Sequence, residues 1–369
     1  MIARLGGVLT TAKKEFPIIT NALTVAQELL VARRKEVLAV GLMVLSTLGM
    51  IHPANAQEVT YIIFDPPGST VTRPTSINAE GAITGSYNDA NFVLHGFLRA
   101  PDGSFTTFDA PGAAYTFPAS INRVGAIAGS YDDANFVLHG FLRSPDGTIT
   151  TFDPPGSKGD PFGPGTGVAA INGAGEITGS YQSSTTIHGF LRSRHGTFNT
   201  FDPPGSVGTF PASINAEGAI TGAYSDGQNI HAFLRVRDGT ITTFDVPGPT
   251  SNPTPVGINR AGEIAGSYLD PTGNYSHGFL RARDGTFTKF DVPAAPETFP
   301  TGLNSKGEIT GWYYDANFNG HGFLRAPDGT FTTFDPPGYT GTGPTRINSA
   351  GTITGSVNGH GFVRIEDKR

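Results

Sequence analysis

The sequence has 369 residues but no cysteine, a single tryptophan and three methionines, and only 15% of its residues are charged. Without cysteine there are no disulfides and no thiolate metal or redox sites, so packing alone must hold the fold together. The net charge of −6 argues against nucleic acid or an anionic membrane surface as the main partner. Fifty glycines and 28 prolines interrupt the chain every few residues and leave little room for long helices. Glycine does not recur at every third position, which excludes collagen, and 10% aromatic residues can build a core, which argues against disorder.

Residues 1–56 differ in composition from the rest of the chain. They carry six Lys or Arg against three Glu, and an apolar run from Val37 to Ile51 precedes Pro53-Ala54-Asn55-Ala56. A basic segment, an apolar segment and an Ala-x-Ala signal are typical of a secretory leader, here cleaved after Ala56. A membrane anchor would need about 20 apolar residues, more than this run provides. The sequence therefore predicts an exported bacterial protein (periplasmic, cell-surface or secreted) with no membrane span after cleavage. Its basic segment is long for a leader, and a start at Val31 would make it ordinary.

One unit recurs seven times in residues 57–369. Each copy has four short segments rich in aromatic or β-branched residues, which predict four strands of about five residues each. Asn-x-x-Gly separates the first two segments, and Pro-Asp-Gly or a near variant separates the last two; both are tight-turn sequences. The dipeptide Phe-Asp ends each copy, at spacings of 44, 44, 49, 43, 46 and 44 residues: Phe64-Asp65, Phe108-Asp109, Phe152-Asp153, Phe201-Asp202, Phe244-Asp245, Phe290-Asp291 and Phe334-Asp335.

A period of this length with four strands is typical of one blade of a β-propeller. The segment Thr60–Asp65 reads as the fourth strand of a copy, whereas the last copy ends with its third strand, His360–Arg364. The two ends complement each other, so the prediction is an all-β, seven-bladed propeller closed by pairing the N-terminal strand with the C-terminal three strands. An outer-membrane barrel would need strands of about 9–11 residues. An open solenoid gives no reason for complementary ends.

Seven of the nine histidines begin the third strand of a copy, and in six copies an aspartate lies 14 residues later. Antiparallel counting through the intervening turn places each histidine opposite that aspartate. A pair repeated in every copy favours a structural hydrogen bond over seven metal or acid–base sites. The predicted pairs are His95–Asp109, His139–Asp153, His188–Asp202, His231–Asp245, His277–Asp291, His321–Asp335 and, across the closure, His360–Asp65.

The repeat pattern as a whole resembles a known family. It reads Ile-Asn-x-x-Gly-x-Ile-x-Gly-x-Tyr, followed by His-Gly-Phe-Leu-Arg-x-x-Asp-Gly-x-Phe-Thr-Thr-Phe-Asp, and is similar to the HAF-type extracellular repeat of bacteria. The tripeptide that names the family stands at His231-Ala232-Phe233. The resemblance covers residues 58–366 and implies a secreted or surface location and a propeller-like repeat. It implies no catalytic residues, because the family carries no established activity.

Chain direction places the loops between the second and third strands, and those between copies, on one face of the predicted propeller. These loops vary most among the copies, and they combine aromatic residues with Asn and Asp. Such a surface suits sugar rings, and it equally suits a protein partner anchored by aromatic side chains. Each phenylalanine could instead pack its loop against a blade. The candidate ligand-binding residues are Arg73, Phe117, Phe210 and Phe299 near the channel, and Phe92, Phe136, Tyr275 and Phe318 on the loops.

Motifs of familiar enzyme classes are absent: the sequence has no Gly-x-Ser-x-Gly, no His-Glu-x-x-His and no phosphate-binding glycine loop. Acidic residues such as Asp132, Asp133 and Asp270 lack the alternating spacing of a calcium loop, so no metal or other cofactor is predicted.

Three residues break the repeat, His195, Trp312 and Arg346, but none has an evident catalytic partner in the sequence. The prediction is a monomeric, non-catalytic binding module for an extracellular glycan or protein. The alternative is a glycan-processing hydrolase or lyase with its site at the channel mouth of the variable-loop face.

Overall fold

The computed structural model describes residues 58–161, 163–248 and 252–366. The predicted leader and its cleavage site lie outside these residues. The described residues form strands and turns and contain no helix, which confirms the all-β prediction. Accordingly, this part of the chain has no helix able to span a membrane.

Twenty-eight strands are assigned in the described residues, and they follow the repeat. Their bounds are β1 Val59–Phe64, β2 Val71–Ile77, β3 Ile83–Asn88, β4 Leu94–Arg99, β5 Phe105–Phe108, β6 Ala113–Ile121, β7 Ile127–Asp133, β8 Leu138–Arg143, β9 Ile149–Phe152, β10 Thr166–Ile171, β11 Ile177–Gln182, β12 Ile187–Arg192, β13 Phe198–Phe201, β14 Gly208–Ile214, β15 Ile220–Ser225, β16 Ile230–Arg235, β17 Ile241–Phe244, β18 Thr254–Ile258, β19 Ile264–Leu269, β20 Ser276–Arg281, β21 Phe287–Phe290, β22 Glu297–Leu303, β23 Ile309–Tyr314, β24 Gly320–Arg325, β25 Phe331–Phe334, β26 Thr342–Ile347, β27 Ile353–Val357 and β28 His360–Glu366.

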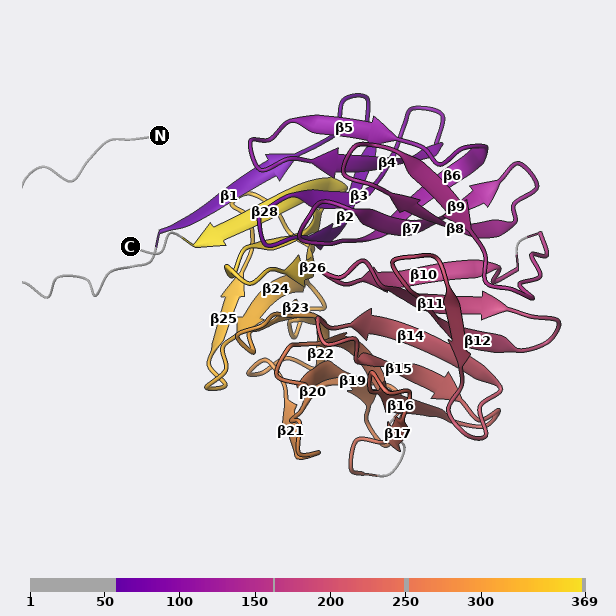
Figure 1. Cartoon of the computed structure of the whole chain (residues 1–369). Helices are drawn as coiled ribbons and strands as arrows, with labels where there is room; N and C mark the ends of the chain where they lie inside the picture. The colour runs from indigo at the N-terminus through magenta and orange to yellow at the C-terminus, as the bar shows by residue number, and fades with distance from the viewer. Residues whose placement is uncertain (1–57, 162, 249–251, 367–369) are drawn as a thin grey trace, which may run out of the picture. The chain divides into compact units, whose positions relative to one another are not determined.

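Hydrogen bonds group these strands into antiparallel sheets of four. Strands β2–β5, β6–β9, β18–β21 and β22–β25 each form a separate sheet in chain order. Strands β10–β13 and β14–β17 repeat that order but are joined by a single parallel bridge between Ile187 and Gly208. Figure 1 shows these sheets following one another in chain order. The four-stranded antiparallel unit is therefore the one that the sequence predicts.

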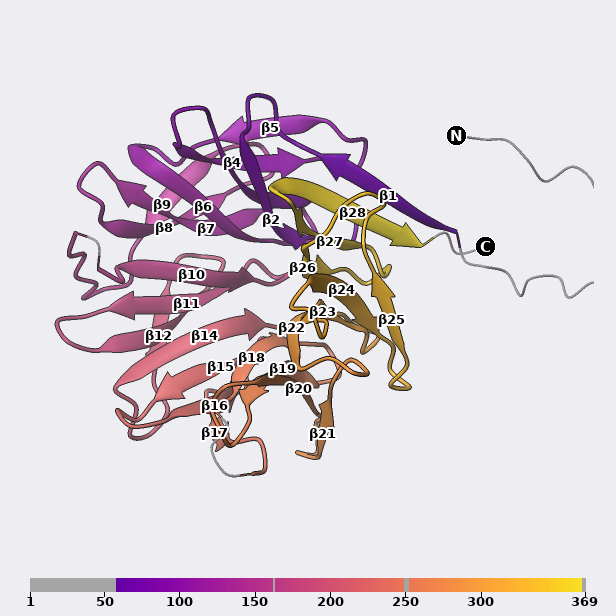
Figure 2. The same ribbon diagram turned by 180° about the vertical axis from the view of Figure 1, so that it is seen from behind.

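The first and last described strands lie in one sheet. Its strand order is β1-β28-β27-β26. Strand β1 pairs antiparallel with β28 along its whole length, from Val59 opposite Glu366 to Phe64 opposite Gly361. Figures 1 and 2 show the two strands side by side from opposite directions. The N-terminal strand thus supplies the fourth strand that the last copy lacks.

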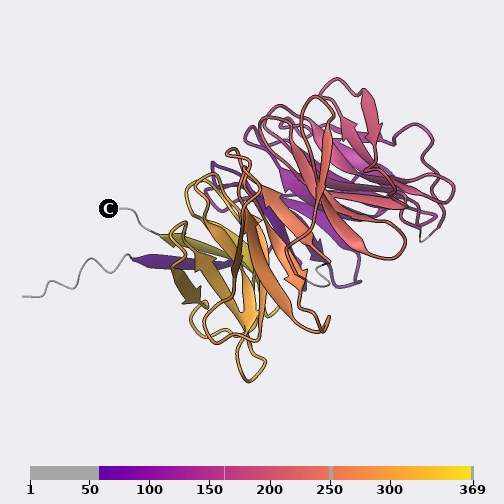
Figure 3. The same cartoon turned by 90° about the horizontal axis from the view of Figure 1, so that it is seen from below.

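The hydrophobic core lies between neighbouring sheets. In every copy the isoleucine that begins the second strand and the phenylalanine of the third strand are fully buried. Phe97 of β4, for example, meets Phe64 of β1 edge to face, with 6.2 Å between ring centroids. Figure 3 shows the successive sheets from below. Since burial of one such ring stabilises a fold by about 1.5–3 kcal/mol, this repeated layer explains how a chain without disulfides holds together.

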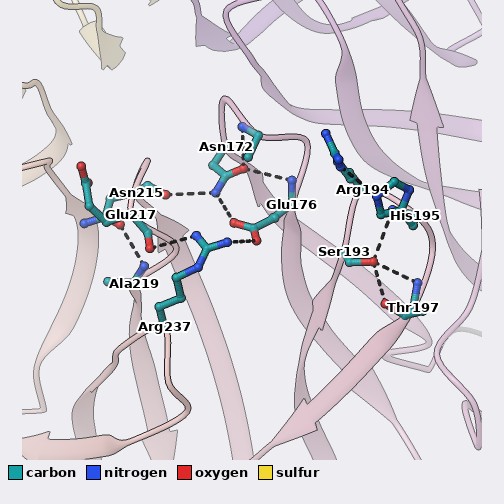
Figure 4. A network of polar contacts seen from close by, with 11 residues as sticks. Asn172, Glu176, Ser193, Arg194, His195, Thr197, Asn215, Glu217, Ala219 and Arg237 are labelled. Carbon is teal, nitrogen blue, oxygen red and sulfur yellow. Dashed lines mark hydrogen bonds and ion pairs between the residues drawn. The ribbon is translucent and has the colours of Figure 1, made fainter.

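An asparagine follows the first strand of every copy, and its side chain links each sheet to the next. Each Nδ2 donates a hydrogen bond to the main-chain carbonyl oxygen of the next asparagine, at 2.9–3.4 Å. The series runs Asn78, Asn122, Asn172, Asn215, Asn259, Asn304, Asn348 and back to Asn78. Figure 4 shows the step from Asn172 to Asn215. The series therefore links each copy to the next and the seventh copy to the first.

Glycines in the second strand permit a close approach of the first. Strand β2 has a bulge between Pro74 and Ser76, and this bulge presses its backbone against Gly85 of β3. A Cβ atom on Gly85 would lie 2.2 Å from the carbonyl oxygen of Arg73. Only glycine fits this position without moving the backbone.

Candidate functional site

Every third-strand histidine contacts the aspartate that follows the fourth strand of its own sheet. The Nδ1–carboxylate distance is 2.6–3.0 Å in all seven pairs, which are those that the register count predicts. In four copies the other carboxylate oxygen accepts a hydrogen bond from a buried threonine of the next sheet. These contacts are Thr72 to Asp65, Thr166 to Asp153, Thr209 to Asp202 and Thr342 to Asp335. The aspartate thus connects neighbouring sheets as well as neighbouring strands, which supports a structural role.

In the first six copies a tyrosine of the second strand also packs against the imidazole. The rings of Tyr87 and His95 are 5.3 Å apart, and those of Tyr131 and His139 are 5.2 Å apart. The imidazole is therefore held between an aromatic ring and a carboxylate. Among the described residues, no group of three or more His, Asp or Glu side chains is placed to hold a metal ion.

The seven third-strand arginines cover phenylalanine rings of the preceding sheet. Each guanidinium carbon lies 4.7–5.1 Å from a ring centroid, a cation–π arrangement. The pairs are Arg99–Phe64, Arg143–Phe108, Arg192–Phe152, Arg235–Phe201, Arg281–Phe244, Arg325–Phe290 and Arg364–Phe334. These arginines therefore connect neighbouring sheets.

On the variable-loop face, three candidate phenylalanines adopt a left-handed backbone conformation. Phe92, Phe136 and Phe318 have φ angles of 62°, 59° and 61°. Each is the last residue of an Asp-Ala-Asn-Phe loop, and its N–H donates to the carbonyl oxygen of the loop's aspartate at 3.0–3.1 Å. The turns between third and fourth strands have the same hydrogen bonds but carry glycine here, as at Gly103 with φ 91°. The side chains of Phe92 and Phe318 are 78% and 69% exposed.

In the second copy these loops form an aromatic pocket. A cavity of about 490 Å³ is lined by Phe117, Ser130, Asp132, Phe136, Leu138 and Gly163. The ring of Tyr115 lies 6.5 Å from that of Phe117 and 6.1 Å from that of Phe136. Burial raises the pKa of the Asp132 carboxyl, Asp133 raises it further, and His139 opposes the shift. The pocket therefore offers aromatic faces together with a hydroxyl and a carboxyl group. Ser130 was not identified from the sequence, although it lies directly opposite Phe117 in the register of β6 and β7 and counting residues could have found it. The burial of Asp132 depends on the fold.

In the sixth copy a second aromatic cluster leads to an exposed ring. Phe299 stacks on Trp312, the only tryptophan of the chain, with 4.0 Å between centroids and 15° between planes. Tyr314 meets Trp312 edge to face at 5.2 Å, and its ring lies 6.3 Å from that of the exposed Phe318. Trp312 is thus explained as the partner of Phe299, which is half-buried in this stack.

The other predicted residues lie in separate copies. Arg73 is exposed, and its guanidinium donates to Oδ1 of Asn88, whose Nδ2 donates to the carbonyl oxygen of Phe92 at 3.2 Å. Phe210 and Tyr275 are 40% and 44% exposed and belong to neither aromatic cluster. The eight candidates therefore form no single site.

His195 lies apart from these candidates, in the turn between β12 and β13. Its Nε2 accepts a hydrogen bond from Nε of Arg194 at 2.9 Å, and its main-chain N–H donates to Oγ of Ser193 (Figure 4). These contacts are local to the turn.

A central cavity of about 450 Å³ lies between the first strands of several copies. It is lined by residues of the first, second, third, sixth and seventh copies, and it shares Phe117 and Ser130 with the aromatic pocket. Arg346 of β26 is its only charged lining residue among those described. The sequence showed Arg346 as a break in the repeat, but the cavity around it could not be predicted from the sequence.

Comparison with known proteins supports the fold and leaves the activity open. No protein-family model matches the chain, and no curated protein matches it in sequence. Virginiamycin B lyase from Staphylococcus aureus matches with a TM-score of 0.60 and 15% identity, over 84% of this chain and 100% of that chain. Streptogramin B lyase matches with a TM-score of 0.57 and 17% identity, over 84% and 98%. Puromycin hydrolase matches with a TM-score of 0.56 and 13% identity, over 82% of this chain and 54% of that chain. These proteins are β-propellers, so the likeness shows a β-propeller fold for this chain.

Proposed function

We propose that the protein is an exported seven-bladed β-propeller that binds an extracellular glycan through its variable-loop face, without chemical turnover. The cyclic series of seven asparagine hydrogen bonds and the pairing of β1 with β28 support seven blades and a closed ring. The leader pattern in residues 1–56 and the resemblance to the HAF-type repeat support export.

The observation that carries the binding function is the left-handed conformation of Phe92, Phe136 and Phe318. A residue with a Cβ atom in this conformation costs about 1–2 kcal/mol relative to glycine. The six turns between third and fourth strands have the same hydrogen bonds and use glycine at the equivalent position, so such a turn does not require phenylalanine there. Backbone strain kept at an exposed position points to a function of the side chain.

A glycan fits this surface better than a protein partner. The exposed rings are distributed over different copies and alternate with Asn and Asp, as in Asp89-Ala90-Asn91-Phe92. A stable protein interface buries a contiguous area of about 1,200–2,000 Å² with a desolvated centre. Sugar rings need only separate aromatic faces for their C–H groups and polar atoms for their hydroxyls. The cavity of about 490 Å³ beside Phe136 is within the size range of ligand pockets.

The test is a glycan array followed by calorimetry on the purified full chain. We expect an oligosaccharide to bind unchanged, and Phe92→Ala with Phe318→Ala to weaken its binding about tenfold or more, since exposed aromatic anchors contribute 1–2 kcal/mol each. Val124→Ala is the matched control, because Val124 is 65% exposed in a tight turn on the opposite face. Retention of a protein from the cell envelope that depends on Phe92, with no glycan bound, would replace the glycan by a protein partner.

One observation favours the enzyme alternative. The neighbouring carboxyls Asp132 and Asp133 have pKa values shifted in opposite directions, upward by burial for Asp132 and downward by the N–H of Val137 for Asp133. Glycosidases use two carboxyl groups with such a difference. Asp133, however, accepts hydrogen bonds from the main-chain N–H groups of Asn135 and Val137, so it already serves its loop. Product release from a bound oligosaccharide, abolished by Asp132→Asn, would establish the enzyme.

A further inference from the structure

The central cavity contains a cation that the fold does not require. Arg346 lies in the bulge of β26, the strand of the seventh copy that faces the cavity. The equivalent positions of the other copies hold small side chains or none: Ser76, Ser120, Ala170, Ser213, Gly257 and Gly302. A small residue therefore suffices to form the strand, so the strand itself does not explain the arginine.

Arg346 is half-buried, and its guanidinium has no carboxylate partner among the described residues. Its Nη1 donates to the main-chain carbonyl oxygens of Thr301 and Thr345, and no described residue provides an acceptor for Nη2 or Nε. Burial lowers its pKa with no opposing carboxylate, whereas Asp102 opposes the same effect at Arg99. Binding of an anion would stabilise this partly desolvated guanidinium, because the anion compensates for the water that burial removes.

The threonines of the cavity and the free edge of Arg346 indicate which kind of ligand fits. The hydroxyls of Thr75 and Thr301 already donate to the main-chain carbonyl oxygens of Pro118 and Pro344, both at 2.8 Å. Their oxygens can therefore only accept, which suits hydroxyl groups of a ligand. A guanidinium with one unused edge, formed by Nε and Nη2, matches one planar carboxylate, held by two parallel hydrogen bonds. A phosphate dianion would leave one negative charge without a partner.

We propose that the central cavity binds the carboxylate of an acidic sugar unit through Arg346. This inference rests on the proposed glycan-binding function and specifies its ligand as an acidic glycan. The cavity shares Phe117 and Ser130 with the aromatic pocket of the second copy. A glycan stacked on the rings of that pocket can therefore continue into the cavity, with its uronate unit at Arg346.

The test compares glucuronate with glucose, which has a hydroxymethyl group in place of the carboxylate, by calorimetry on the full chain at low and high salt. We expect glucuronate to bind about tenfold or more tightly than glucose, and salt to reduce this preference. Arg346→Ser, which restores the residue found in three other copies, should abolish the preference, and a cooperative unfolding transition in urea should show that the variant is folded. Arg346→Lys keeps the charge but not the planar guanidinium with its two parallel donors, so it should retain only part of the preference for glucuronate.

The possible results separate this inference from the function on which it rests. Equal binding of glucuronate and glucose, unchanged by Arg346→Ser, overturns the acidic ligand and leaves the aromatic face untouched. The acidic ligand is also overturned if neutral glycans bind through Phe92 and Phe318 while glucuronate does not bind. If no sugar of either kind binds and the array is empty, both proposals are wrong. A glucuronate preference that depends on Arg346 but not on Phe92 or Phe318 supports the cavity site and contradicts the role of the loop face.

Discussion

The Nδ2 atom of Asn348 donates a hydrogen bond to the main-chain carbonyl oxygen of Asn78 at 3.0 Å, across 270 positions of the sequence. Both residues are buried, and theirs is the bond that returns the asparagine series to its start. It joins the seventh copy to the first on the inner strands, while the pairing of β1 with β28 joins the ends on the outer strands. Two separate contacts therefore link the last copy to the first.

Removal of that donor should destabilise the whole domain. Asn348→Asp keeps an Oδ1 atom for the N–H groups of Ala350 and Thr352, both at 3.0 Å, but loses the donation to Asn78. We expect a loss of about 1–3 kcal/mol in the free energy of unfolding, because a buried carbonyl loses its partner. Urea unfolding measures it. Asn317→Asp, in an exposed loop, is the control and should change stability by less than about 0.5 kcal/mol. Equal effects of the two changes would show that the hydrogen bond from Asn348 to Asn78 contributes nothing to stability.

The fold was largely predictable because its signals are local and repeated. Strand length, turn chemistry and the opposition of His95 to Asp109 follow from counting residues within one copy. The hydrogen bond of Thr72 to Asp65 could not be predicted in this way, because it crosses between sheets whose spacing the sequence does not define. The stack of Phe299 on Trp312 could have been found, since the two residues are directly opposite in the register of β22 and β23.

The candidate site was less predictable than the fold. The loop residue Phe92 could be proposed as a ligand contact, but its positive φ angle depends on the hydrogen bonds of the loop. The break at Arg346 was visible, yet its surroundings come from copies far apart in the sequence. The repeat predicts the contacts that all copies have in common, whereas a binding site is formed by residues that differ between copies.

Relief of backbone strain gives a direct test of the loop conformation. Phe92→Gly should raise the free energy of unfolding by about 1 kcal/mol relative to Phe92→Ala, because alanine keeps the unfavourable φ of 62° and glycine does not. Both variants lose the ring, so both should bind glycan equally poorly. Thermal and urea unfolding measure the difference. If Phe92→Gly is no more stable than Phe92→Ala, the loop is not strained, and the argument from strain to function is wrong.

Protonation of His321 should stabilise the fold. The hydrogen bond with Asp335 raises its pKa, burial opposes the shift, and Asp315 adds to it. Because the folded pKa lies above that of the unfolded chain, the contribution is complete below about pH 6.5 and is lost as the pH rises through the folded value. Titration of the imidazole by NMR should show a pKa that falls in Asp335→Asn and falls less in Asp315→Asn. An unchanged pKa in Asp335→Asn contradicts the assignment.

The contribution of Asp315 to stability should have the opposite pH dependence to that of His321. The main-chain N–H and side chain of Asn319 lower the pKa of its carboxyl to about 2, and the N–H of Asn317 and His321 add to the effect. The folded pKa lies below that of the unfolded chain, so the contribution is present above about pH 4 and is lost as the pH falls toward 2. Unfolding measured from pH 5 to 2 should show a smaller acid dependence in Asp315→Asn than in the unaltered chain.

Two glycines of neighbouring strands should differ in their tolerance of a methyl group. At Gly85 a Cβ atom would meet backbone atoms of β2, with the carbonyl oxygen of Arg73 at 2.2 Å, and backbone cannot move without shifting the strand. At Gly96 the nearest atoms belong to the Phe108 ring, at 2.8 Å, and a ring can turn aside. The fourth copy shows that this is possible, because fully buried Ala232 occupies the position equivalent to Gly96 there, opposite Phe244. We therefore expect Gly85→Ala to cost about 1–3 kcal/mol and Gly96→Ala clearly less, both measured by urea unfolding. A reversed order would mean that the bulge of β2 moves more readily than the packed phenylalanine, and that the repeated second-strand glycine has a purpose other than close approach.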